Sequence, residues 1–316
     1  MNGIPAIGYS VGQSIARLPL RVARRAVRAL RNRLGPAQLK RWKRELLFPI
    51  RNRLLRGTPV SVAIDGVSVW LAPRSERAAE YWSGLRSDSQ ELRFLLAILE
   101  PGMTFFDAGA NEGLFALTAA KKLGSGRVYA FEPRGRAYQV LEQNLHLNGV
   151  QNVEAIRVAL GEFTGEMLLP ANTQCTDGLQ AGERVAPMDS QAPGREKVCV
   201  TTLDAFLEAR AIPSVDAIRV DVGGAELPMF RGARNLLAQD AAPLIFYGGY
   251  GSKTKRFGYH PVETMWLLNE YGYSLFVLDT ETGQVAPRPP GSEYDAMVVA
   301  AKPGHPLSRR LAGSVR

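Results

Sequence analysis

A glycine-containing turn is the part of the sequence with the clearest capacity for chemistry. Asp107 ends a predicted strand, and Gly109, Asn111 and Gly113 follow before an alanine-rich helix begins. Glycine lets the backbone pass close to a ligand. The first amides of a helix carry partial positive charge, so the turn, which also contains Ala110, suits an anionic group such as a carboxylate.

A second carboxylate follows at the end of the next predicted strand. Glu132 lies about 20 residues beyond the turn, where an acid typically accepts hydrogen bonds from ribose hydroxyls. Taken alone, the turn also fits a plain strand-to-helix connection. The order of strand, turn, helix and acid favours a nucleotide-type cofactor site. Asn111 breaks the G-x-G-x-x-G spacing and Asp107 immediately precedes the turn, which disfavours a nicotinamide dehydrogenase.

Alternating helices and strands must position these residues. The apolar patterns predict helices at 91–99, 114–123 and 136–148, and strands at 104–108, 127–131, 153–158, 217–220, 244–247, 274–278 and 296–300. This order predicts an α/β fold with a doubly wound, seven-stranded, mostly parallel sheet, joined by helical crossovers. The polar, Gly- and Pro-rich residues 161–197 predict an insertion of strands or loops.

The N-terminal part has a different composition. Residues 1–56 contain 14 Lys and Arg but only one acid, Glu45, and residues 18–34 have the spacing of a basic amphipathic helix. Asp65-Gly66 between two strand-like runs predicts a β-hairpin. We expect a helical arm at 1–56, a hairpin and entry segment at 57–90, the main domain at 91–302 and a tail at 303–316.

Cysteine content and hydropathy bear on the compartment. Cys175 and Cys199 cannot form a disulfide framework and have no metal-ligand spacing near them, so we expect reduced thiols and no metal site. No apolar run approaches the roughly 20 residues that span a bilayer, and arginines interrupt every candidate signal sequence. These features predict a cytoplasmic protein, with peripheral association at the inner membrane face through the basic arm.

From about Thr58 to Lys302 the sequence resembles the FkbM-type methyltransferases, which have the class I, Rossmann-like fold and use S-adenosyl-L-methionine. The resemblance rests on motifs in a specific order and spacing. They are FFDAGANEG (105–113), VYAFEP (128–133), VALGE (158–162), TTLDAF (201–206) and VDAIRVDVGGAELPMFRGARNLL (215–237).

The resemblance implies site residues on the donor side. It implies that Asp107, Gly109, Ala110, Asn111 and Gly113 line the cofactor turn. It also implies that Glu132 holds the ribose and that Ala159 lies beside the adenine. The expected reaction is O-methylation of a hydroxyl on a sugar, glycolipid or secondary metabolite, so the expected partner is a small-molecule or glycan acceptor.

The acceptor side is less well defined by the sequence. Asp221 follows a predicted strand and is a candidate to position or deprotonate an acceptor hydroxyl, although a loop-capping role fits equally well. Gly223 and Tyr247 stand where the family usually has acids. His260 is a candidate replacement base, and a loop histidine without catalytic duty is the alternative. The two missing acids leave open a cofactor-binding domain with lost or altered activity.

The basic arm at 1–56 allows three interpretations. It can lie on an anionic membrane surface, bind nucleic-acid phosphates or pack on the body as a solvated helix. Aromatic residues for base stacking are scarce in the arm, which makes nucleic acid the less favoured partner. An RNA methyltransferase therefore stays an alternative. The Asn/Asp-Pro-Pro-Tyr signature of base amino methylation is absent after the strand at 217–220.

Overall fold

The structure is a computed structural model that describes residues 38–40, 43–54, 58–64, 66–72, 76–83, 89–170, 195–288 and 296–307. The chain divides into two compact units. Residues 1–62 and 70–87 form one unit, and residues 63–69 and 88–316 form the other. The predicted amphipathic helix at 18–34 lies outside the described residues.

The first unit contains short helices. A π-helix at Lys43–Leu47 leads into α4 (Phe48–Leu54), and α5 (Glu76–Ser83) follows later in the chain. The rings of Phe48 and Trp82 lie 5.7 Å apart, and Arg44 forms an ion pair with Glu80 at 3.5 Å. The predicted hairpin is confirmed, because β1 (Val60–Ile64) and β2 (Val67–Leu71) form a two-stranded sheet.

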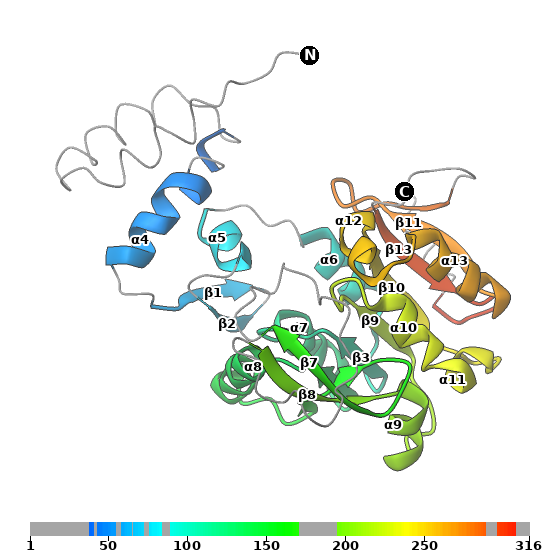
Figure 1. Cartoon of the computed structure of the whole chain (residues 1–316). Coiled ribbons are helices and arrows are strands. Elements are labelled where there is room, and N and C mark those ends of the chain that lie inside the picture. The colour runs from blue at the N-terminus through cyan, green and yellow to red at the C-terminus, as the bar shows by residue number, and fades with distance from the viewer. Residues whose placement is uncertain are drawn as a thin grey trace. The chain divides into compact units, whose positions relative to one another are not determined.

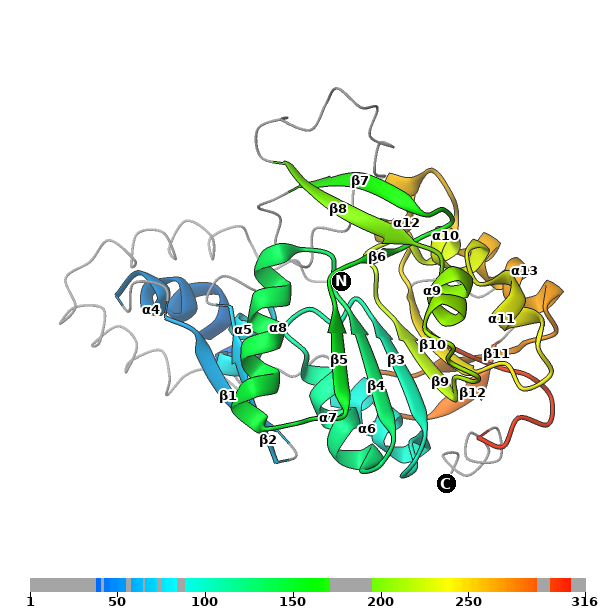
Figure 2. The ribbon, with the colours of Figure 1, turned by 90° about the horizontal axis from the view of Figure 1, so that it is seen from below.

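The second unit is built on an eight-stranded sheet (Figures 1 and 2). In spatial order its strands are β12 (Val285–Pro287), β11 (Ser274–Leu278), β13 (Ala296–Ala301), β10 (Leu244–Gly249), β9 (Ala217–Val220), β3 (Thr104–Ala108), β4 (Arg127–Phe131) and β5 (Val153–Ile156). Seven of these strands match the prediction. The short edge strand β12 was not predicted. β13 runs antiparallel to both β10 and β11, whereas β10, β9, β3, β4 and β5 are parallel.

Helices cover both faces of this sheet, as a doubly wound fold requires. One face packs in a common core with α9 (Leu203–Ala209), α10 (Glu226–Arg231), α11 (Arg234–Ala238) and α13 (Pro261–Glu270). The other face carries α6 (Ser89–Ile98) and α7 (Leu114–Leu123), where Phe94 contacts Phe246 of β10. The helix α8 (Gly135–Asn148) lies alongside β5 (Figure 2).

Strand alternation decides which side chains meet. Successive residues of a strand point to opposite faces of the sheet. Phe106 and Ala108 of β3 join the core formed by α9, α10, α11 and α13. Asp107 therefore points toward the face that carries α7. In β9 the same alternation places Arg219 on that face, because Ile218 and Val220 belong to the opposite core.

The predicted insertion adds a small second sheet. Its strands are β6 (Ala159–Leu160), β7 (Gly165–Pro170) and β8 (Arg195–Thr201), in the order β6-β8-β7. β7 and β8 pair antiparallel, so of the two alternatives given for this segment, strands or loops, its described parts contain strands. The intervening residues 171–194 lie outside the described residues. After β10 come two short helices that were not predicted, α12 (Gly251–Thr254) and a 3-10 helix (Lys255–Phe257).

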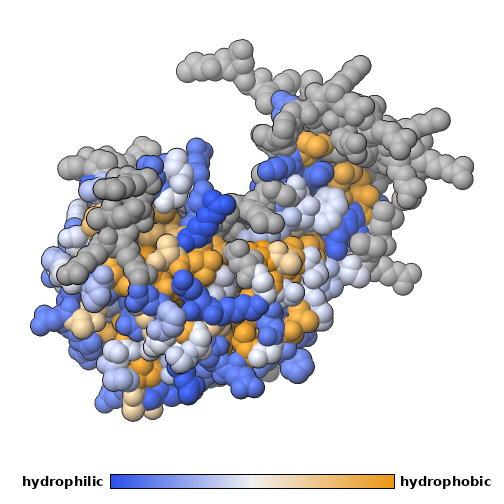
Figure 3. All heavy atoms as spheres, turned by 180° about the vertical axis from the view of Figure 1, so that it is seen from behind, coloured by the Kyte–Doolittle hydropathy of each residue, from blue (hydrophilic) through white to orange (hydrophobic). Residues whose placement is uncertain are grey.

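The surface mixes polar and apolar residues. On the face drawn in Figure 3, hydrophobic residues gather in patches that hydrophilic residues separate. Within the described residues, no helix is both long and apolar enough to cross a membrane. The described part of the chain also contains no cluster of three His, Cys, Asp or Glu side chains that could hold a metal ion.

Candidate active site

The turn after β3 is fastened to the end of β4. The backbone amides of Gly109 and Ala110 both donate to the carbonyl oxygen of Phe131, each over 2.9 Å. The Gly113 amide donates to the Ala110 carbonyl over 2.8 Å and closes the turn just before α7. The predicted sequence of strand, turn and helix is thus confirmed. The turn lies at the carboxyl end of the parallel strands, where open α/β sheets bind their ligands.

The two glycines of this turn lie so close to neighbouring protein atoms that a side chain at either position would clash. Gly109 has φ +83°, and a Cβ on it would lie 2.1 Å from the carbonyl oxygen of Asp221. Gly113 has φ +87°, and a Cβ there would lie 2.4 Å from Cδ1 of Leu141. The sequence attributed these glycines to close approach of a ligand, whereas here they allow β9 and α8 to approach the turn. Asn111 is also left-handed at φ +53°, which asparagine tolerates.

Glu132 lies beside the turn, as predicted. One carboxylate oxygen accepts the Asn111 amide and the other accepts the Arg134 amide, each over 3.0 Å. Burial raises the pKa of Glu132 to about 7, although these two backbone hydrogen bonds and the charge of Arg134 oppose the rise. The carboxylate is therefore oriented by the backbone and keeps lone pairs for further donors.

The turn has a further support that the sequence did not reveal. Asn144 of α8 is fully buried, and its Nδ2 donates to the carbonyl oxygen of Glu112 over 2.7 Å. This bond satisfies a carbonyl in the middle of the turn and joins it to the helix that follows β4. Only the spacing of an asparagine on the inner face of a helix could have suggested it.

A buried ion pair lies beneath the turn. Arg219 of β9 is 2% exposed, and its Nη1 lies 2.9 Å from Oδ1 of the fully buried Asp107. The guanidinium also stacks over the ring of Phe115, 3.9 Å from its centroid. Asp107 therefore supports the turn through this buried ion pair, and its side chain does not reach the surface. Arg219 was not predicted as a site residue, although an arginine within the otherwise apolar strand AIRV was a signal in the sequence.

The ion pair continues to the predicted acceptor residue. Nη2 of Arg219 and Nζ of Lys253 each lie 3.1 Å from an oxygen of Asp221. Burial acts to lower the pKa of Lys253, but the charges of Asp221 and Glu226 and the hydrogen bond to Asp221 outweigh it and raise that pKa. Asp221 is 32% exposed, so its carboxylate is held between two cations at the surface of the strand end.

A second carboxylate lies behind this edge. Glu226 at the start of α10 is 2% exposed, and it accepts the Gly224 amide at 3.1 Å and the Tyr259 hydroxyl at 3.3 Å. The Tyr259 hydroxyl also lies 2.7 Å from the Gly224 carbonyl oxygen. Burial raises the pKa of Glu226 to about 7, helped by the charge of Asp221. Neither Glu226 nor Tyr259 was predicted as a site residue.

The two positions where the acids are missing have different environments. Gly223 has φ +69°, a left-handed conformation that glycine adopts without cost and glutamate does not. Tyr247 belongs to the core shared with α10 and α13, with its ring 5.6 Å from that of Phe230. Its hydroxyl is buried and has no hydrogen-bond partner among the described residues. Burial and the nearby charge of Glu226 raise the pKa of Tyr247.

The other two predicted site residues lie elsewhere. His260 is the N-cap of α13, where its Nδ1 accepts the Val262 amide at 3.3 Å and its own amide donates to Glu263 at 2.8 Å. This arrangement gives the imidazole a helix-capping role, and catalysis by His260 stays a prediction. Ala159 is buried in β6, in a small cluster that includes Ala225 of the β9 loop. Its place beside an adenine also stays a prediction.

Comparison with known proteins bears on the identity of this site. A family model described as the methyltransferase FkbM domain matches residues 107–275, slightly more than half of the chain. The chain belongs to the FkbM methyltransferase family. The match begins at Asp107. It includes the turn at 107–113 (the donor turn), Glu132 and Asp221 at the end of β9. The doubly wound sheet of this FkbM domain therefore has the class I, Rossmann-like fold that the resemblance implied, with S-adenosylmethionine as its cofactor.

Two proteins of similar sequence are methyltransferases by name, and one solved structure aligns with the chain at low similarity. The chain is 29% identical over 140 residues to methyltransferase 1 of Beauveria bassiana, covering 40% of this chain and 56% of that protein. It is 23% identical over 182 residues to the hexuronic acid methyltransferase AglP of Haloferax volcanii, covering 57% and 70%. The putative transferase PH0793 of Pyrococcus horikoshii aligns with a TM-score of 0.42 at 15% identity, covering 84% of each chain. The chain thus spans a little over half the length of the first relative.

The donor-side residues of this FkbM domain fit the cofactor. Each oxygen of Glu132 already accepts one backbone amide, so a ribose diol can use the remaining lone pairs. Gly113 offers no side chain to cap α7, which leaves the helix start without a side-chain acceptor. A carboxylate such as that of methionine suits this position.

Proposed function

We propose that this domain transfers the methyl group of S-adenosylmethionine to a hydroxyl of a sugar, glycolipid or secondary metabolite. The observation that carries the proposal is the contact between Asp221 and the donor turn. The Asp221 amide donates to the Ala108 carbonyl over 2.9 Å, and Gly109 lies directly against the Asp221 carbonyl. A partly exposed carboxylate is thereby held next to the turn that binds the donor.

The reaction needs alignment and removal of one proton. The sulfonium supplies an activated methyl group, so the protein must orient the acceptor oxygen and accept its proton. We assign both the orienting contact and the acceptance of this proton to Asp221, whose carboxylate Arg219 and Lys253 fix from two sides. Arg219 in turn is fixed by Asp107, so the position of the acceptor group depends on the same ion-pair chain that supports the donor turn.

One relative supports the acceptor class. AglP is by name a hexuronic acid methyltransferase, which favours a sugar acceptor. A domain that binds the cofactor without turnover is the alternative that Gly223 and Tyr247 motivate. An RNA methyltransferase is the other alternative, motivated by the basic arm.

Labelled methyl transfer tests the proposal. Full-length protein is incubated with S-adenosylmethionine labelled in the methyl group and with cell-envelope glycan extract, a lipid extract or total RNA. We expect label in the glycan or lipid fraction and its loss in Asp221→Asn. The exposed Asp240→Asn is the matched control and retains transfer. Label in RNA alone supports the RNA methyltransferase. Binding of S-adenosylhomocysteine without any transfer supports the inactive domain.

We also propose that the basic arm at 1–56 associates with anionic membrane surfaces. Its 14 basic residues against one acid support this, because each Lys or Arg near such a surface contributes about 1 kcal/mol. Flotation with phosphatidylserine vesicles compares the full chain with a variant that lacks residues 1–56. Equal flotation of the two proteins contradicts the proposal.

A further inference from the structure

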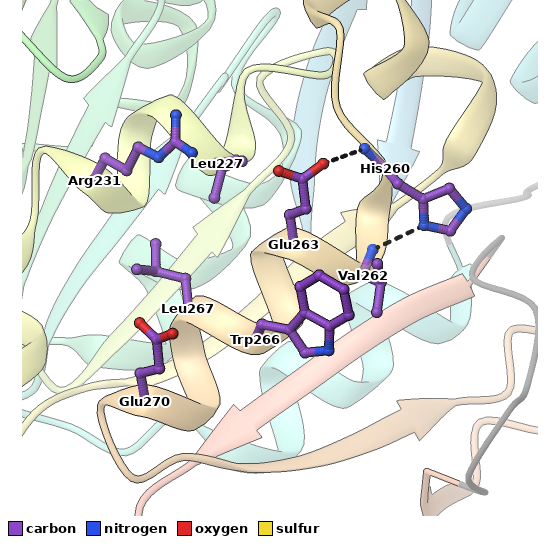
Figure 4. A pocket seen from close by; sticks show the side chains of 8 residues that line it. All are labelled: Leu227, Arg231, His260, Val262, Glu263, Trp266, Leu267 and Glu270. Carbon is purple, nitrogen blue, oxygen red and sulfur yellow. Dashed lines mark hydrogen bonds between the residues drawn. The ribbon is translucent and has the colours of Figure 1, made fainter.

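A hollow between α10 and α13 lies outside the donor site (Figure 4). Its volume is about 360 Å³, within the size range of small-ligand sites. Figure 4 shows side chains of both helices around it, with Leu227 and Arg231 from α10 and Trp266 and Glu270 from α13. The hollow therefore combines apolar walls with charged groups.

The aromatic wall of the hollow is unusually exposed. Trp266 is 59% exposed, compared with 38% for Trp70 and 42% for Leu147, the other exposed large hydrophobic residues described. Its Nε1 has no hydrogen-bond partner within the described part of the chain. The neighbouring Met265 and Leu268 already bury the inner face of α13. The indole therefore adds little to the core, while its flat ring can stack on a ligand.

The polar groups of the hollow define the charge of that ligand. Glu270 is exposed and has no hydrogen bond or ion pair within the described residues. Glu263 uses Oε1 to accept the His260 amide, which leaves Oε2 for another donor. Arg231 is exposed and has a long 3.8 Å ion pair with Glu162. Two carboxylates and one guanidinium favour a ligand with several hydroxyl or amine donors and disfavour an acidic one.

The hollow is connected through Leu227 to the segment that follows Asp221. The Leu227 amide donates to the Tyr259 hydroxyl over 3.2 Å, and that hydroxyl lies 2.7 Å from the Gly224 carbonyl oxygen in the loop after β9. Leu227 also follows Glu226 directly. The hollow thus borders α10, the helix that directly follows the loop beginning with Asp221.

We propose that the hollow binds a neutral or amino sugar ring of a glycan acceptor, a ring other than the one methylated. The apolar C–H face of such a ring stacks on Trp266, and its hydroxyls donate to Glu263 and Glu270. The proposal rests on the sugar acceptor proposed above, and it adds a second subsite that excludes acidic rings.

Direct binding to the full-length protein tests this subsite without methyl transfer. The probes are the neutral cellotetraose and chitotetraose and the acidic tetragalacturonate, titrated by calorimetry and tryptophan fluorescence. We expect saturable binding of at least one neutral probe, at least tenfold tighter than that of tetragalacturonate. Trp266→Ala weakens this binding at least tenfold. Trp70→Ala, which removes another exposed indole, leaves it unchanged.

A charge variant tests the role of the two carboxylates. In Glu263→Gln/Glu270→Gln the preference for the neutral probe over tetragalacturonate should fall at least threefold. Absence of saturable, Trp266-dependent binding for both neutral probes overturns the proposal. The proposal is also overturned if the hollow binds a protein partner and only Trp266→Ala abolishes that binding. Affinity for S-adenosylhomocysteine is measured in parallel. Sugar binding without methyl transfer counts against the proposed function, whereas transfer that Trp266→Ala leaves unchanged counts against the subsite.

Discussion

Arg219 and Asp107 are register partners in the neighbouring parallel strands β9 and β3, and their side chains form a buried ion pair at 2.9 Å. The pair joins the strand before the turn at 107–113 to the strand before Asp221. Removal of either partner leaves a charge in the interior, and that costs more than an exposed ion pair contributes.

Arg219→Met should therefore lower the free energy of unfolding by about 3 to 5 kcal/mol. The guanidinium that balances Asp107 and stacks on Phe115 is lost. Arg210→Met is the control, because Arg210 forms a largely exposed pair with Glu154, and it should cost less than about 1 kcal/mol. Urea unfolding measures both variants. Equal losses would show that the buried pair has no special weight.

Glu132→Gln should weaken S-adenosylhomocysteine binding by about tenfold or more, the scale of one charged hydrogen bond. The amide keeps the shape of the side chain but removes the charge that ribose hydroxyls favour. Because the pKa of Glu132 is about 7 in the free protein, wild-type affinity should rise as the pH increases from 6 to 8. Calorimetry at both pH values measures this change. A pH-independent wild-type affinity would contradict the ribose role.

Glu226 should make stability depend on pH. Its pKa of about 7 in the folded protein exceeds the ordinary value of 4.5, so the folded state retains a proton that the unfolded chain releases. This contribution is complete below pH 4.5 and is lost as the pH rises toward 7. Its size is roughly 1 to 3 kcal/mol. Glu226→Gln should reduce the loss of stability between pH 5 and pH 8, measured by urea unfolding. An unchanged difference would contradict the assignment.

Gly109→Ala should cost at least about 3 kcal/mol of stability, because its Cβ would overlap the Asp221 carbonyl and its φ is +83°. Gly149→Ala is the matched control, since Gly149 is also left-handed at φ +61° but has open space around it. That variant should cost only about 1 kcal/mol. Thermal unfolding compares the two. Similar costs would mean that the turn can move away from β9.

The sequence was sufficient to predict most of the sheet. Strands such as Thr104–Ala108 and Arg127–Phe131 carry apolar runs bounded by turn residues, and both occur with the predicted bounds. The edge strand Val285–Pro287 was missed because three residues give no periodicity. The two short helices after β10 were also not predicted. Lys253 and Tyr259 of this segment contact Asp221 and Glu226, which are distant in the sequence.

Site residues could be predicted to lie together only where each of them directly follows its own strand. Glu132 and the turn follow their strands directly, so their proximity was visible in the sequence. Arg219 and Asp107 are separated by 112 positions, and their pairing depends on the register of two strands. The position of Tyr247 in the core depends on which face of β10 it occupies, which no local pattern in an all-apolar strand reveals.

The antiparallel strand β13 has a consequence for assembly of the chain during synthesis. It is the last strand of the described residues in sequence, yet it lies between β10 and β11 and pairs with both. β11 therefore has no place in the growing sheet until residues 296–301 have left the ribosome. Until then, the edge of β10 that β13 later covers is exposed, and such unpaired edges are prone to aggregation. A nascent chain that stalls before residue 296 thus lacks the piece that joins β11 and β12 to the rest.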